Sequence, residues 1–163
     1  MDNTCFVVAG SGRARIFLLE KSPVPRAPPR LIERGTLANA DLKSRGRSVT
    51  GRPRTETNTN REAGPVHPMG AQRERHRIEL ERRFSVEIAR KAAALARNWS
   101  TGSVVLVANP RMLGFLRDAV RGALKPGIRV KELAKDYAHL TVSTLQDHLA
   151  LSGVLPARDG GAR

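Results

Sequence analysis

The apolar residues of this chain follow a strand-like pattern at first, become rare in the middle, and follow a helical pattern after residue 72. The first part predicts a meander of three short strands, at residues 5–9, 13–20 and 30–37. Within the second strand, Ala14 and Ile16 are expected on the face opposite Arg15 and Phe17, because strand side chains alternate between the two faces. Residues 10–12, Gly-Ser-Gly, are expected to form the hairpin turn, with positive φ available at either glycine.

The part after residue 72 predicts helices and strands in alternation. A long helix has its apolar face at spacings of three and four residues, formed by Leu80, Phe84, Ile88, Ala92, Leu95 and Trp99. A second helix is predicted to begin at the Asn109-Pro110 cap and a third at the Thr141 cap. Two strands are predicted between them, at residues 103–108 and 128–133. The run at 103–108 is continuously apolar, so we expect it in the centre of the sheet, covered on both faces.

These elements predict one α/β domain over residues 1–153, followed by a disordered tail at residues 154–163. Strands separated by helices imply parallel pairing with right-handed crossovers, whereas the meander is antiparallel. The expected architecture is therefore a mixed sheet of about five strands with three helices and a long loop between the third strand and the first helix.

The middle of the chain, at about residues 42–71, is rich in Gly, Pro, Arg, Thr and Asn and predicts a flexible basic loop. The chain has 29 Lys and Arg against 15 Asp and Glu, and its net charge of +14 favours an anionic partner. Arginine-rich segments bind phosphate backbones by releasing counterions, so RNA or the ribosome is the predicted partner. An acidic protein, an anionic membrane surface and a loop without a partner are the alternatives. The residues expected to contact nucleic acid are Lys43, Arg45, Arg47, Arg52, Arg54, Arg61, Arg73, Arg75 and Arg77.

The composition argues against several other classes of protein. A single cysteine, Cys5, excludes an intramolecular disulfide framework and a cysteine-rich zinc site. The four histidines form no pair at i,i+3 or i,i+4, so neither a metal nor a cofactor is predicted. The chain has no apolar run long enough to span a membrane and no basic segment before its first apolar run. These features favour a cytoplasmic location.

Polar residues that follow the last two strands could form a ligand site, because ligands of open α/β sheets commonly bind beyond the carboxyl ends of the strands. These residues are Asn109, Arg111, Lys135, Asp136 and His139. For His139, a hydrogen bond to its own turn is the simpler expectation. A two-metal nuclease is not expected, because it requires converging carboxylates and the first strand carries none.

Three segments in order, VVAGSGRARIF, SVVLVANPRMLGFLRD and KELAKDYAHLTVSTLQDHL, resemble the bacterial host-attachment protein family. Members of that family are described as required for attachment to host cells. The family is similar to the central domain of archaeo-eukaryotic peptide-chain release factors, so the resemblance implies a ribonuclease H-like fold. This chain departs from the family at Gly10, where members often carry Asp, and at TETNTNREAG, where they often carry an acidic loop with histidine.

In release factors, a Gly-Gly-Gln tripeptide precedes the long helix, and its Gln places water at the peptidyl-tRNA ester. Gly70-Ala71-Gln72 stands at the corresponding place, with Ala at the middle position. The charge therefore favours a non-catalytic domain that binds RNA or the ribosome, and the resemblance implies that it is release-factor-like and has a role in host attachment. The alternatives are a hydrolase of an ester such as peptidyl-tRNA, acting through Gln72, and a regulatory protein-interaction module.

Overall fold

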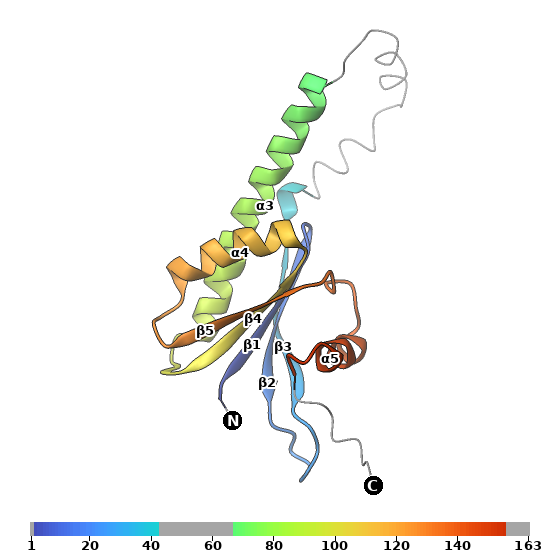
Figure 1. The fold of residues 1–163 in the computed structure, drawn as a ribbon. Coiled ribbons are helices and arrows are strands. Elements are labelled where there is room, and N and C mark those ends of the chain that lie inside the picture. The colour runs from blue at the N-terminus through green and yellow to red at the C-terminus, as the bar shows by residue number, and fades with distance from the viewer. Residues whose placement is uncertain (1, 43–66, 156–163) are drawn as a thin grey trace.

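The computed structural model describes residues 2–42 and 67–155. They form a five-stranded mixed sheet with helices on both faces (Figure 1). In chain order the elements are β1 (Thr4–Ala9), β2 (Arg13–Glu20), β3 (Arg30–Ala38), α3 (His67–Leu95), β4 (Gly102–Ala108), α4 (Pro110–Ala123), β5 (Ile128–Ala134) and α5 (Val142–Leu151). Residues 40–42 add one further helical turn. The α/β class and the five-stranded mixed sheet predicted from the sequence are confirmed.

The strand order is β3-β2-β1-β4-β5. The meander β1-β2-β3 is antiparallel, whereas β4 lies parallel to β1 and β5 parallel to β4. The central strand is therefore β1, and the expectation that residues 103–108 would be central is wrong by one position. Every residue of β4 is nevertheless buried, as its apolar run predicts.

Two hydrophobic cores lie on the two faces of the sheet. The first contains Ala14 and Ile16 of β2 and is covered by α3 and α4, and the second contains Phe17 of β2 and is covered by α5 (Figure 1). The alternation in β2 thus predicts both faces correctly. Cys5 lies in the first core, where burial raises the pKa of its thiol to about 12. It packs there as a small apolar residue.

The helix ends agree with the sequence signals at α4 and α5. Asn109 accepts a hydrogen bond from the backbone N–H of Met112 at 2.9 Å, with Pro110 in the first turn of α4. Thr141 accepts from the backbone N–H of Thr144 at the start of α5. After α5, Gly153 has a φ of 77°. This is the left-handed conformation that glycine supplies where a helix stops.

Three local expectations are corrected by the structure. Helix α3 begins at His67, so residues 67–71 are helical rather than part of the loop. The turn at residues 10–12 closes through a hydrogen bond from the N–H of Gly10 to the carbonyl of Arg13, and neither of its glycines has positive φ. The folded domain also extends past residue 153, because Leu155 is buried in the second core. The remaining residues of the predicted loop and tail, 43–66 and 156–163, lie outside the described residues.

Candidate nucleic-acid interface

Helix α3 is much longer than the sheet that it covers. It has 29 residues, and from Gly70 onward its first buried side chain is that of Leu80. At 1.5 Å per residue, the part before Leu80 is about 20 Å long. Figure 1 shows this part extending beyond the sheet. We call residues 70–79 the helical arm.

The arm displays the three helical arginines that the sequence predicts as nucleic-acid contacts. Arg73, Arg75 and Arg77 are all exposed. Arg77 lies 3.5 Å from the carboxylate of Glu81, one turn further along the helix. Among the described residues, neither Arg73 nor Arg75 forms an ion pair. The arm therefore carries two arginines, Arg73 and Arg75, that no described carboxylate pairs with.

The two acidic residues of the arm, Glu74 and Glu79, form ion pairs with other arginines. Glu79 accepts hydrogen bonds from Arg82 at 2.6 Å and from Arg83 at 3.1 Å. The hydrogen bond from Arg82 in particular lowers the pKa of Glu79 to about 2. Glu79 and Arg83 are four residues apart, so this pair lies along one face of the helix. At pH 7, Glu79 is therefore ionised and pairs with Arg82 and Arg83 rather than with Arg73 or Arg75.

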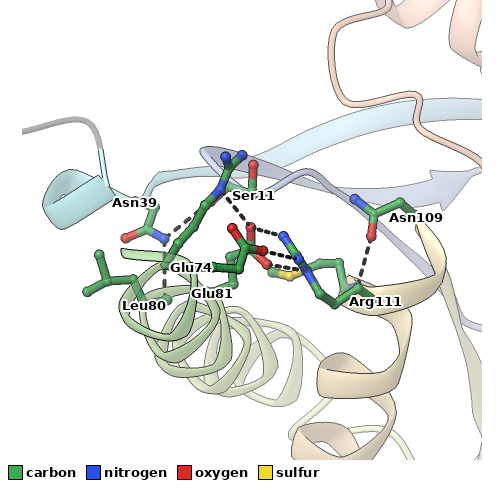
Figure 2. A network of polar contacts seen from close by, with 9 residues as sticks. Ser11, Asn39, Glu74, Leu80, Glu81, Asn109 and Arg111 are labelled. Atoms are coloured by element: carbon green, nitrogen blue, oxygen red, sulfur yellow. Dashed lines mark hydrogen bonds and ion pairs between the residues drawn. The ribbon is translucent and has the colours of Figure 1, made fainter. Parts of the chain in front are cut away.

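The base of the arm is fixed by a polar network between α3 and α4 (Figure 2). Its centre is Glu81, whose side chain is only 2% exposed. Arg111 of α4 binds this carboxylate through two bonds, from Nε to Oε2 at 2.8 Å and from Nη2 to Oε1 at 2.9 Å. The same guanidinium donates through Nη1 to Glu74 of the arm at 2.9 Å. One arginine thus holds two carboxylates that are two turns apart on α3.

Arg111 reaches α3 because of how α4 begins. The Asn109 cap and Pro110 fix the first turn of α4 directly after β4, so Arg111 stands at the second helical position. The hydrogen bonds to Glu81 and to Glu74 raise the pKa of Arg111, Glu81 being the larger cause. A bidentate arginine–carboxylate pair also fixes orientation, so this contact ties the base of the arm to the first turn of α4.

A second contact at the base of the arm comes from Asn39, which follows β3. Its side-chain amide donates to the carbonyl of Ser11 at 3.2 Å and to the carbonyl of Leu80 at 3.4 Å (Figure 2). Its backbone N–H also donates to the carbonyl of Gly12 at 2.9 Å. The β1–β2 turn and α3 are therefore joined through one buried amide.

The five residues predicted as a ligand site at the strand ends do not form one cluster. The side chain of Asn109 caps α4, and that of Arg111 binds carboxylates of α3, the helix that covers the first core. Lys135, Asp136 and His139 are exposed in the segment after β5. That segment packs on the second core through Ala138. The two groups of residues thus belong to opposite faces of the sheet.

The candidate catalytic residue is exposed. Gln72 lies within the helical arm, and Gly70, two residues before it, has no positive φ. The GAQ segment is therefore ordinary helix rather than the tip of a loop. Over residues 2–42 and 67–155, no group of three or more His, Cys, Asp and Glu side chains is placed to hold a metal ion. Within the same ranges, no helix is long and apolar enough to cross a membrane.

Sequence reasoning missed Glu81. A carboxylate one position after the apolar Leu80 looks like a solvated residue, and its partner Arg111 lies 30 residues further along the chain. A weak signal was present, because Glu81 begins a stripe of small residues at spacings of four, four and three, namely Ser85, Ala89 and Ala92, all of which are buried. Small residues at helical spacing indicate a close helix neighbour, which here is α4.

The structure is that of an α/β domain with a long helix that projects beyond its sheet. A family model described as "Protein required for attachment to host cells" matches residues 5–149. The chain belongs to this family, as the resemblance seen in the sequence implied. No curated protein matches it.

Proposed function

We propose that this protein is a non-catalytic, cytoplasmic RNA- or ribosome-binding domain whose helical arm contacts the phosphate backbone. The observation that supports this proposal best is the pair of exposed arginines, Arg73 and Arg75, on a helix end that projects from the sheet, because the carboxylates of that helix end pair with other arginines. The net charge of +14 supports it independently. The expected contacts Lys43, Arg45, Arg47, Arg52, Arg54 and Arg61 precede the arm in the chain and lie outside the described residues.

Such an interface binds by counterion release, and its affinity depends strongly on salt. The arm carries no Phe, Tyr or Trp between Gly70 and Glu79, so it lacks the large aromatic side chains on which bases stack best. Binding should therefore discriminate poorly between RNA sequences. A non-catalytic role agrees with the exposed, helical position of Gln72.

A ribonuclease H-like, release-factor-like fold is part of the proposal. The strand order β3-β2-β1-β4-β5, with β2 alone antiparallel to the other strands, supports it. Family membership links the protein to host attachment. We propose that a cytoplasmic RNA-binding domain would affect attachment indirectly, through the synthesis of other proteins.

The test is a fluorescence titration of labelled RNA at several salt concentrations. Replacing Arg73 and Arg75 together with Gln removes two phosphate contacts and should flatten the slope of log K against log salt by roughly 1.4–1.8. The matched control replaces Arg90 and Arg97, which are also exposed, with Gln. If control and arm variant lose the same affinity, or if the wild type does not bind RNA at low salt, the proposal is wrong.

A further inference from the structure

The two edges of the sheet differ in how they are protected. At the β3 edge, Gln146 of α5 donates to the carbonyl of Pro29 at 2.9 Å and accepts from the N–H of Leu31 at 3.4 Å. The amide side chain thus occupies backbone groups that would otherwise be open to another strand. The pairing of β2 with β3 also shifts register between Ile16 and Phe17, which is the irregularity of a bulge.

The β5 edge has neither form of protection among the described residues. It pairs with β4 over seven consecutive positions without a shift, from Gly102–Ile128 to Ala108–Ala134. Residues 129–132 are all exposed, so solvent reaches both faces of the strand. Apart from the ladder with β4, the described backbone hydrogen bonds of β5 lie at its ends, at the N–H of Ile128 and the carbonyl of Leu133. A long, regular, uncovered edge strand is a template for pairing with another chain.

The charges on this edge are positive on one face. From the register with β4, Arg129 and Lys131 lie on the same face as the buried Val105, and both are exposed. Arg129 forms a surface ion pair with Asp2 at 3.4 Å, which an acidic partner would have to replace, whereas Lys131 forms no ion pair among the described residues. The acidic Glu132 points to the other face, where Arg117 of α4 binds its carboxylate. Its hydrogen bond from Arg117 lowers the pKa of Glu132, so the pair persists as ions at neutral pH.

A second copy of this chain is a poor occupant for the edge. Two copies related by a two-fold axis through the sheet would pair β5 antiparallel about one central residue. An axis at Val130 places Arg129 opposite Lys131, and an axis at Lys131 places that residue opposite itself. An axis at Glu132 places Arg129 opposite Lys135. Each of these registers brings like charges together across the strands, which is destabilising.

We propose that the β5 edge binds an extended acidic segment of a partner protein by strand addition. Main-chain hydrogen bonds to β5 would supply affinity, and alternate Asp or Glu side chains facing Arg129 and Lys131 would supply selectivity. On the other face, the partly exposed Val130 would contact an apolar residue of the partner. This inference is independent of the proposed RNA interface, because β5 and the arm share no residue.

The test uses a fluorescein-labelled heptapeptide that alternates Glu and Val, and measures its binding to the full chain by anisotropy at low salt. Replacing Arg129 and Lys131 together with Glu should weaken binding at least tenfold. The charge-matched control replaces Arg90 and Arg97 with Glu, and a third variant replaces Arg73 and Arg75 with Glu. Both should bind the peptide as the wild type does. An equal loss in all three variants would show attraction to net charge alone and would overturn the proposal.

A second measurement identifies strand addition itself. Two versions of the peptide carry N-methyl groups on alternate residues, one set on the odd positions and the other on the even positions. Because an added strand uses the N–H groups of one edge only, one version should lose binding at least tenfold and the other should retain it. Equal binding of both versions, or no binding of the unmodified peptide at millimolar concentration, would overturn the proposal. These peptides act on the wild-type chain, so the result does not depend on the folding of a variant.

Discussion

Replacing Arg111 with alanine should destabilise the domain far more than its partly exposed position suggests. The side chain of Arg111 is 43% exposed, but its partner Glu81 is 2% exposed and would remain as a buried carboxylate. The only other described ion-pair partner of Glu81 is Arg77, whose Nε lies 3.5 Å from Oε1 of Glu81. Breaking a buried ion pair costs about 3–5 kcal/mol. Because Arg77 remains, we expect a value at the lower end, about 3 kcal/mol, which at this chain length lowers Tm by roughly 6–12 °C.

The control is the other carboxylate that the same guanidinium binds. Glu74 is 53% exposed, so Glu74→Ala removes a surface ion pair and should cost at most about 1 kcal/mol. Urea unfolding followed by circular dichroism measures both values on the same scale. A third variant, Arg111→Met with Glu81→Leu, removes both charges and should recover most of the loss. If Arg111→Ala costs no more than Glu74→Ala, burial of Glu81 does not determine the energetics of the network.

Three further predictions follow from the packing and from the carboxylate pKa values. Val105→Asp places an unpaired charge in a strand that is buried on both faces. The variant should therefore lose the cooperative thermal transition followed by circular dichroism. If the variant unfolds as the wild type does, the buried position of β4 is wrong. Gly102→Ala puts a Cβ at 2.7 Å from the carbonyl oxygen of Asn3, so it should lower the free energy of unfolding in urea by about 2 kcal/mol. The control is Gly122→Ala, where a Cβ meets nothing within 4 Å, and it should not lower this free energy. Hydrogen bonds from Arg15 and Arg117 lower the pKa values of Glu33 and Glu132, so these carboxylates stabilise the fold above about pH 4.5, and the contribution is lost as the pH falls through the lowered values. The Glu33→Gln, Glu132→Gln double variant should therefore be less stable than the wild type at pH 7 and approach it at pH 3, and a constant difference in urea midpoint across this range would contradict the assignment.

Local patterns predicted the elements well because each signal acts over a few residues. Alternation in β2 and the Asn109-Pro110 cap depend only on neighbours, and both appear in the structure as expected. The start of α3 was placed too late because Gly70 and the nearby prolines resemble loop sequence. Proline is common in the first helical turn, so Pro68 was a usable signal for an earlier start.

Long-range arrangements could not be read from the same patterns. A continuous apolar run shows that β4 is covered on both faces, but not that β1, rather than β4, lies at the centre. The pairing of Glu81 with Arg111 depends on the crossing of α3 and α4, which no spacing within one helix reveals. For the same reason, the residues predicted as a ligand site shared an end of the sheet but were divided between its faces.

Ribosome co-sedimentation from cells would show whether the protein associates with RNA or the ribosome through the arm, as we propose. Lysates prepared at low salt, with and without crosslinking, would be fractionated, and the protein followed by immunoblot beside the Arg73→Gln, Arg75→Gln variant. We predict that the wild type sediments with ribosomes or other RNA, is released by nuclease or by high salt, and sediments less when the arm is neutralised. Recovery of both proteins in the ribosome-free fractions, unchanged by nuclease, would contradict the account.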